Sequence, residues 1–387
     1  MNDLDKIINR RGTMSVKYDR KDKDIIPLWI ADMDFMTSPG IKKSLLKLVE
    51  KNIYGYAEAD EKYFANLKTW MKKFHNFEFQ NKEVVLTPGI VFALATAIKA
   101  YSKEGDYILI QKPVYYPFSI SILVNGRKIL NNPLVYDKRN NTYKINFLDF
   151  EKKIKLKKPK AFILCSPHNP VGKVWKKDEL KLMSEICKKN NVIIISDEIH
   201  MDFAYGEHKH TVLSNVKKEF EKSTLILTAP SKAFNLAGLQ ISNTIIKNQD
   251  LREKFQKEIA KTGYSQLNIA GLYAGREAYK SGEKYFFEIK EYIYNNILFV
   301  EEYLYAKMPK AKLVFPEGTY LVWIDFSSYG FSDVKLNDLI LHKAKVWLDA
   351  GTMFGKEGSG FQRINVACSR KLLKKALDRI RKVIENE

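Results

Sequence analysis

The chain has 387 residues, of which 45% are hydrophobic, and it carries a formal net charge of +20 at pH 7. This length suits one large domain with a smaller one, and the sequence has no apolar run of about 18 residues that would predict a membrane span. Residues 1–6 carry acids where a signal peptide needs cations, and the three cysteines have neither a disulfide nor a metal-ligand spacing. We therefore expect a cytoplasmic protein that binds no metal.

The lysines are spread along the chain rather than gathered in one basic block, as the segment 152–158 and the pair 374–375 illustrate. No helix-turn-helix pattern or zinc-finger spacing accompanies them. The charge is therefore typical of a lysine-rich solvated surface, which also attracts anionic substrates and cofactors. We expect neither nucleic acid nor a membrane as a partner.

The first two thirds of the chain alternate short apolar runs with helical patterns. The runs that predict strands lie at residues 84–86, 107–111, 161–165, 192–196, 224–228 and 242–246. Helical patterns at 92–100 and 178–189 separate some of them. Several runs are apolar at both alternating positions, as expected for a parallel sheet covered on both faces. This alternation predicts an α/β fold with a mainly parallel central sheet.

The last third of the chain has a different pattern. A long helical pattern at 284–307 is followed by predicted strands at 312–315, 320–326 and 361–367, and by helices near 335–345 and 370–385. This order is typical of a smaller α+β domain. We expect residues 46–284 to form the large domain, and residues 1–45 with 285–387 to form the small one.

In open α/β sheets, ligands bind beyond the carboxyl ends of the strands, so the residues that follow each predicted strand are the candidate site. After the first strand, Gly89 precedes the backbone N–H groups of Ile90 and Val91 at a helix start, which is a phosphate-binding arrangement. After the second strand, Tyr115 offers an aromatic face to a flat ring.

The next three strand ends carry polar side chains. Asn169 precedes a proline, which keeps its backbone extended, so its amide can point into a cleft. Asp197 follows a wholly apolar strand, where a carboxylate is costly unless it meets a cation such as a protonated ring nitrogen. Lys232 follows the fifth strand, and its amine can serve as a Schiff-base residue when burial lowers its pKa. Ser231 and Thr228 place hydroxyls one and four residues before it.

Each of these features has an ordinary structural explanation when taken alone. Lys232 could be a solvated lysine at a strand end, and Glu198, beside Asp197, could support the site from behind or pack between the domains. The spacing of His200, His208 and His210 matches no standard metal site. Together, however, the five strand ends supply what a pyridine ring with a phosphate arm and an aldehyde requires. We therefore expect pyridoxal 5'-phosphate (PLP) as the cofactor.

Longer motifs strengthen this interpretation. The chain resembles the fold-type I PLP-dependent enzymes of the class I/II aminotransferase superfamily, which have an aspartate aminotransferase-like fold, and within them the PatB/MalY-type cystathionine β-lyases. The resemblance rests on the segments 17–19, 27–35, 54–56, 166–175, 196–200, 231–240 and 363–367. The branch is indicated mainly by Ala31-Asp32-Met33-Asp34-Phe35 and by Asp197-Glu198-Ile199-His200.

The resemblance implies a role for each candidate residue at the cofactor ring. Lys232 carries the Schiff base and later removes the α-proton of the substrate. Asp197 pairs with the ring nitrogen, Asn169 donates to the ring hydroxyl oxygen, and Tyr115 stacks on the ring. His200 occupies the position where many aminotransferases have a tyrosine, so its role is open.

The resemblance also implies which residues bind the phosphate and which bind the substrate. The phosphate is expected to bind Gly89, Ile90, Val91, Ser231 and Thr228. Tyr56 of a neighbouring subunit is expected to reach the same phosphate and to take part in catalysis. This implies a homodimer whose active site is shared across the interface. Tyr54 is the less favoured candidate for this role. Arg363 is expected to clamp the substrate α-carboxylate, with Asp32, Tyr115 and Asn169 as further substrate contacts.

One position departs from the aminotransferase pattern. Aminotransferases usually place an arginine on the phosphate eight residues after the lysine, whereas this chain has Gln240. This difference fits the lyase branch. From the resemblance to that branch we expect a carbon–sulfur β-lyase acting on cystathionine or cysteine S-conjugates. An aminotransferase, and a regulatory binding protein on the same scaffold, are the alternatives.

Overall fold

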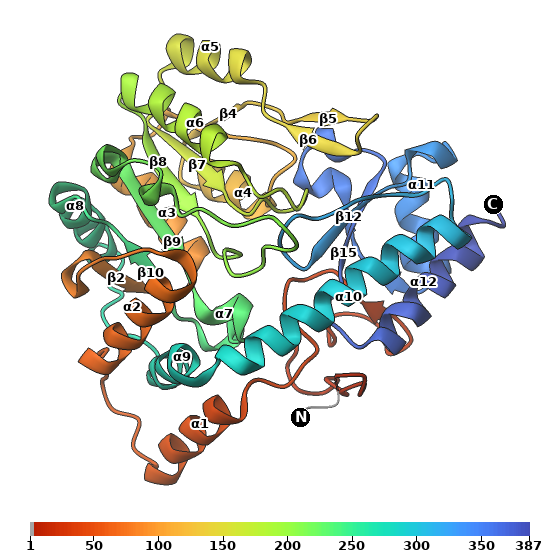
Figure 1. The fold of residues 1–387 in the computed structure, drawn as a ribbon, viewed down its shortest axis with the longest axis horizontal. Coiled ribbons are helices and arrows are strands. Elements are labelled where there is room, and N and C mark those ends of the chain that lie inside the picture. The colour runs from red at the N-terminus through yellow and green to blue at the C-terminus, as the bar shows by residue number, and fades with distance from the viewer. Residues whose placement is uncertain (1–3) are drawn as a thin grey trace.

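The computed structural model describes residues 4–387; residues 1–3, which belong to the N-terminal segment considered above, lie outside the described residues. Figure 1 shows a sheet-centred body on one side and a smaller body on the other. The long helix α10 (Glu283–Lys307) runs from the larger body to the smaller one.

A seven-stranded sheet forms the centre of the larger body. Its strands, in spatial order, are β2 (Val84–Thr87), β10 (Ser242–Ile245), β9 (Thr224–Thr228), β8 (Ile193–Asp197), β7 (Ala161–Cys165), β3 (Tyr107–Ile110) and β4 (Lys128–Asn131). Strands β9, β8, β7, β3 and β4 pair in parallel, whereas β10 is antiparallel to both neighbours. The expected mainly parallel sheet is confirmed, with β10 as its antiparallel member.

Both faces of this sheet are covered by helices, which explains the wholly apolar strands. In β3, Ile108 and Ile110 pack on one face while Leu109 packs on the other. The first face is covered by α3 (Ile90–Tyr101), α4 (Tyr116–Val124) and α8 (Gln249–Ala260). The second face is covered by α2 (Glu61–His75), α5 (Phe147–Lys157), α6 (Lys177–Lys189) and α9 (Ile269–Ser281), and α1 (Pro39–Lys51) packs against α9.

The smaller body contains a four-stranded antiparallel sheet. Its strands, in spatial order, are β11 (Lys312–Val314), β12 (Leu321–Asp325), β15 (Phe361–Asn365) and β14 (Asp349–Ala350), with helices α11 (Asp333–Asp338) and α12 (Arg370–Ile384) nearby. Near the N-terminus, β1 (Ile26–Pro27) pairs in parallel with β13 (Val346–Trp347). This pairing brings the N-terminal segment against the C-terminal third of the chain. The division into domains at 45/46 and 284/285 stays a prediction.

The short strands β4 and β14 were not predicted from the sequence. The four residues of β4 begin with a lysine and end with an asparagine, so only two apolar residues mark the strand. Strand β14 has two residues and no periodic pattern at all. A small two-stranded sheet, β5 (Val135–Asp137) with β6 (Thr142–Lys144), was also missed.

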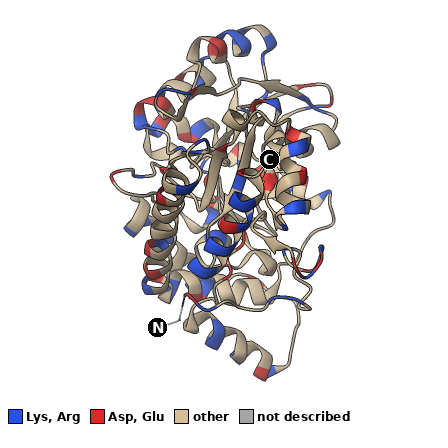
Figure 2. Cartoon of the chain, turned by 90° about the vertical axis from the view of Figure 1, so that its right-hand side faces the viewer, with Lys and Arg blue, Asp and Glu red and all other residues tan. Residues whose placement is uncertain are grey.

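The charged residues are distributed around the molecule. Figure 2 shows lysine and arginine on many helices, with aspartate and glutamate between them. Within residues 4–387, no helix combines the length and the apolar character needed to cross a membrane.

Candidate functional site

A cavity of about 250 Å³ lies at the carboxyl ends of the central strands. It is lined by residues from four of the strand ends identified in the sequence, and by the turn that holds Lys232. The lining side chains and backbone include Gly89, Ile90, Val91, Tyr115, Asn169, Asp197, His200, Ser231, Lys232 and Gln240. The tertiary structure therefore brings together most of the predicted site.

Lys232 lies on the one-turn helix α7 (Pro230–Ala233), directly after β9. Its Nζ donates a hydrogen bond to the carbonyl oxygen of Ala31 at 2.6 Å. Burial lowers the pKa of the Lys232 amine to about 8, although the negative charges of Asp32 and Asp197 oppose this shift. A sizeable fraction of the amine is therefore neutral near physiological pH, as a nucleophile or proton acceptor must be.

Asp197 is the last residue of β8. Its Oδ1 accepts a hydrogen bond from the backbone N–H of Ile199 at 3.1 Å. Burial raises the pKa of this carboxyl to about 7, against the hydrogen bond from Ile199 and the charge of Lys232. A carboxylate in this position is ready to be stabilised by a cation that enters the cavity.

Asn169 and Tyr115 are fixed through their backbones. The N–H of Tyr115 donates to the carbonyl oxygen of Asn169 at 3.0 Å, and the N–H of Asn169 donates to Cys165 Sγ at 3.3 Å. The Asn169 Oδ1 accepts from Arg363 Nη1 at 2.9 Å. Because the oxygen is engaged by a cation, the amide Nδ2 is the group left to donate toward the cavity.

The start of helix α3, which lines the cavity, is suited to an anion. Gly89 precedes the 12-residue helix α3 with a φ of +148°, a conformation that favours glycine. The first N–H groups of a helix have no intrahelical partners, and those of Ile90 and Val91 lie at this start. Ser231 and Gln240 line the same cavity. Thr228 is buried but does not line it, so its contact with a phosphate stays a prediction.

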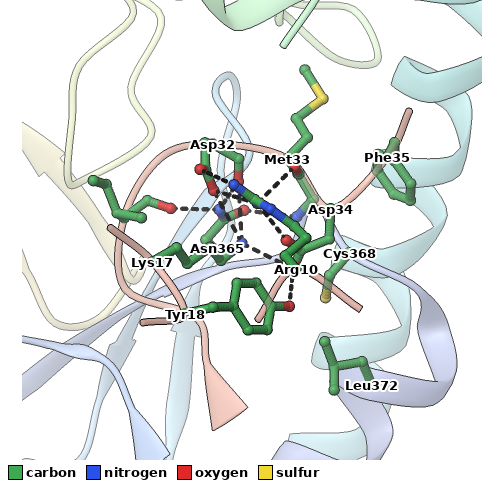
Figure 3. A network of polar contacts seen from close by, with 12 residues as sticks. Arg10, Lys17, Tyr18, Asp32, Met33, Asp34, Phe35, Asn365, Cys368 and Leu372 are labelled. Atoms are coloured by element: carbon green, nitrogen blue, oxygen red, sulfur yellow. Dashed lines mark hydrogen bonds and ion pairs between the residues drawn. The ribbon is translucent and has the colours of Figure 1, made fainter. Parts of the chain in front are cut away.

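The segment 31–35 is held beside Lys232 by a network of charged groups, shown in Figure 3. Arg10 binds Asp32 and Asp34, each at 2.7 Å, and the fully buried Nζ of Lys17 binds Asp34 at 2.9 Å. Although burial acts against it, the hydrogen bond from Arg10 and the charge of Lys17 lower the pKa of Asp32. The Asp32 carboxylate thus faces this network and does not line the cavity, and its role in substrate binding stays a prediction.

The structure places Arg363 on β15, buried and opposite Asp349 of β14. Its Nη2 donates to the carbonyl oxygen of Trp29 at 2.7 Å and to Asp349 Oδ2. Its guanidinium lies over the ring of Phe354, with 4.9 Å to the ring centroid. Arg363 is therefore close to Asn169 but already has partners within the chain.

His200 lines the cavity, and its Nδ1 is buried without a partner among the described residues. Burial, with the positive charges of Lys232 and Arg363, lowers the pKa of His200 well below its usual value, so the ring is neutral. His210 instead binds Glu198 at 2.7 Å. Glu198 also accepts from Ser196 Oγ at 2.8 Å, so it supports the loop behind Asp197.

Tyr56 is 94% exposed and does not line the cavity of its own chain. Tyr54 is also exposed. Among the described residues, no group of three histidine, cysteine, aspartate or glutamate side chains is placed to hold a metal ion.

Two asparagines that the sequence analysis quoted only within motifs organise the site. Asn235 binds the backbone of Met33 and Phe35 through three hydrogen bonds, and Asn365 donates to the carbonyl oxygens of Ile30 and Asp32. Both hold the segment whose Ala31 carbonyl contacts Lys232. Their position within the 231–240 and 363–367 motifs was the only signal that could have found them.

Comparison with known proteins agrees with this geometry. The family model for class I and II aminotransferases matches residues 23–380. The chain belongs to this family. Within the family, it is 38% identical to cystathionine β-lyase PatB of Bacillus subtilis, over 98% of both chains. The expected resemblance to this branch is confirmed.

Two solved structures of family members share the fold closely. A PLP-bound putative aminotransferase from Clostridium difficile 630 is 40% identical, with a TM-score of 0.96 over 99% of this chain and 100% of that one. Cystalysin from Treponema denticola, which contains PLP, is 35% identical, with a TM-score of 0.96 over 100% of this chain and 99% of that one. The expected aspartate aminotransferase-like fold is confirmed.

Proposed function

We propose that this aminotransferase-family protein is a PLP-dependent carbon–sulfur β-lyase. It cleaves L-cystathionine or cysteine S-conjugates by α,β-elimination to a thiol, pyruvate and ammonia. The observation that carries the proposal is the single cavity that gathers Lys232, Asp197 and Asn169 beside a helix N-terminus. The 38% identity to PatB, over nearly the whole length of both chains, supports the lyase reaction.

The residues present fit the cofactor. The low-pKa amine of Lys232 suits the aldehyde of PLP. The Asp197 carboxylate, whose Oδ1 accepts only from the backbone N–H of Ile199 among the described residues, suits a protonated ring nitrogen. Asn169 Nδ2 would donate to the ring hydroxyl oxygen, and Tyr115 would lie on the ring face. The N–H groups of Ile90 and Val91, beside Gly89, with Ser231, would hold the phosphate. Thr228, His200 and Tyr56 remain candidate cofactor contacts.

When bound, PLP supplies an electron-poor ring that stabilises negative charge at the substrate α-carbon. The chain supplies the proton transfers and the orientation. Lys232 Nζ removes the α-proton, because burial keeps part of the amine neutral near pH 7. With PLP bound, Asp197 would keep the ring nitrogen protonated, and Arg363 would bind the α-carboxylate of the substrate. The electron pair of the α-carbon–hydrogen bond forms the new carbon–carbon double bond, and the thiolate leaves the β-carbon with its own pair.

The active form is proposed to be a cytoplasmic homodimer in which Tyr56 reaches the phosphate of the partner subunit. The exposure of Tyr56 and of its apolar neighbours Ile53 and Tyr54, which are 94%, 74% and 59% exposed, supports an interface at this loop. Light scattering of the cofactor-loaded protein tests this part: a monomer with full cofactor occupancy would contradict it.

An aminotransferase reaction is the second candidate. It is favoured by the 40% identity to the PLP-bound putative aminotransferase. Gln240 lines the cavity where aminotransferases usually have an arginine, and this favours the lyase. Strict dependence of turnover on an added keto acid would identify the aminotransferase. A purely regulatory role would be revealed if Lys232→Ala retained the whole cellular effect of the protein.

The decisive experiment is to incubate the PLP-loaded protein with L-cystathionine and to measure pyruvate without an added keto acid. We expect steady pyruvate release from the wild type and from Lys254→Ala, which removes an exposed lysine on α8. Lys232→Ala should lower the rate by at least about 10³-fold because it removes the proton-transfer group. No pyruvate from any S-substituted cysteine would refute the lyase proposal.

A further inference from the structure

The guanidinium of Arg363 is already occupied by a carboxylate of the same chain. Asp349 lies directly opposite Arg363 in the antiparallel pairing of β14 with β15, so the sheet register places the two side chains together. Their side chains are 1% and 2% exposed, and Asp349 Oδ2 accepts from Arg363 Nη2. Any substrate carboxylate that reaches Arg363 therefore meets a second carboxylate.

Three of the five N–H donors of Arg363 have an acceptor within the chain. Nη2 donates to both Trp29 O and Asp349 Oδ2, and Nη1 donates to Asn169 Oδ1. A guanidinium can offer a two-point contact along two edges, Nε with Nη2 or Nη1 with Nη2, and both edges include Nη2. A two-point contact with a new carboxylate therefore requires Trp29 O or Asp349 Oδ2 to give up its hydrogen bond with Nη2.

Of these two acceptors, Asp349 is the one that can give up its hydrogen bond with Nη2. The ion pair is one-point, because Asp349 Oδ1 and Arg363 Nε are both buried without a partner among the described residues. Unsatisfied buried polar atoms of this kind are costly, and a ligand that binds Nε relieves one of them. Burial also raises the pKa of Asp349, although the positive charge of Arg363 opposes this shift.

Arg363 does not depend on Asp349 alone for its position. Trp29 O, Asn169 Oδ1 and the ring of Phe354 hold the guanidinium on other sides. Loss of the Asp349 charge therefore leaves the clamp in place.

We propose that Asp349 is a specificity-determining residue that competes with the substrate α-carboxylate for Arg363 and thereby weakens the binding of amino acids. This inference rests on the proposed function, in which Arg363 is the carboxylate clamp. Asp349 acts through Arg363 and is not itself a group that touches the reacting atoms.

The test compares the wild-type holoenzyme with Asp349→Asn, which keeps an acceptor oxygen and removes the charge. Binding of L-alanine, which has no leaving group, is measured by calorimetry beside L-alaninamide, which lacks the carboxylate. We expect Asp349→Asn to bind L-alanine about 10-fold or more tightly than the wild type, as removal of a nearby like charge implies. The affinity for L-alaninamide should change by less than about twofold, because no carboxylate competes for Arg363. In turnover of L-cystathionine, KM should fall by a larger factor than kcat changes.

Asp349→Ser removes the charge through a smaller side chain and serves as the second variant if Asp349→Asn does not fold. Asp349→Glu keeps the charge and should not tighten L-alanine binding. If the wild type binds L-alanine and the neutral variants bind it equally or more weakly, Asp349 is only a structural support and the inference is wrong. If the wild type releases no pyruvate from any S-substituted cysteine, the proposed function fails and the inference fails with it. If the wild type releases pyruvate but no neutral variant binds L-alanine more tightly, only the inference is wrong.

Discussion

Asn235 is the residue whose replacement most directly tests how the catalytic lysine is held. Its Oδ1 accepts from the backbone N–H of Met33 at 3.0 Å, and its Nδ2 donates to the carbonyl oxygens of Met33 and Phe35, both at 2.9 Å. These bonds hold the segment 31–35 against the turn that carries Lys232, and the Ala31 carbonyl accepts from Lys232 Nζ. Asn235 also has a φ of +56°, which asparagine and glycine tolerate best.

The size of the effect follows from these contacts. Asn235→Gly keeps the backbone conformation and removes three hydrogen bonds, each contributing about 1 kcal/mol net. The free energy needed to open the segment 31–35 should fall by about 3 kcal/mol, which corresponds to roughly 150-fold faster opening-limited exchange. Asn235→Ala should lower it by about 1 kcal/mol more, because alanine is strained at this φ.

Hydrogen–deuterium exchange of a peptide covering residues 30–37, in the chain without cofactor, measures this opening. A peptide covering β12 serves as the internal control, since Asn235 makes no contact there among its recorded hydrogen bonds. We expect faster exchange only in the first peptide. An unchanged rate in residues 30–37 for Asn235→Gly would show that the network of Arg10 and Lys17 holds the segment by itself.

Two further predictions concern the cavity. Because the pKa of Asp197 is raised to about 7, its contribution to stability is present below the unfolded carboxyl pKa of about 4 and is lost as the pH rises toward 7. Without cofactor, Asp197→Asn should therefore melt at a higher temperature than the wild type at pH 8, and this difference should shrink toward pH 4. Equal melting temperatures of the wild type and Asp197→Asn at pH 8 would contradict the burial of this charge. A Cβ at Gly271 would lie 2.4 Å from the Leu239 carbonyl oxygen, whereas a Cβ at Gly238 would meet no atom within 4 Å. Gly271→Ala should thus lower the unfolding free energy by about 2 kcal/mol and weaken PLP binding near Gln240. Gly238→Ala should do neither. Equal melting temperatures and equal PLP titrations for the two variants would refute this prediction.

Much of the fold and of the cavity could be predicted because parallel strands converge at their carboxyl ends. The six short apolar runs marked their strands, and the polar residues after the five that run in one direction had to meet at one edge of the sheet. Strands of two residues, such as β14, carry no pattern and were missed. Helix α10 was found almost to the residue, since 25 residues of helical pattern leave little ambiguity.

The partners of the site residues could not be read from the sequence. Asp32 turns to Arg10 and Lys17, and Asn235 reaches back across about 200 residues to Met33. Side-chain direction at such contacts depends on how separate elements pack, and no local pattern encodes it.

By itself, the sequence determined most of the chemical groups that line the cavity, because local strand and helix patterns set where each polar residue follows an apolar run; Asp32 and Thr228 are exceptions. Only the tertiary structure decided which groups of the chain itself contact them. It places Ala31 O against Lys232 and Asp349 against Arg363. The physical reason is that a buried polar group without a partner is costly, so most of them pair, and the available partners come from distant parts of the chain.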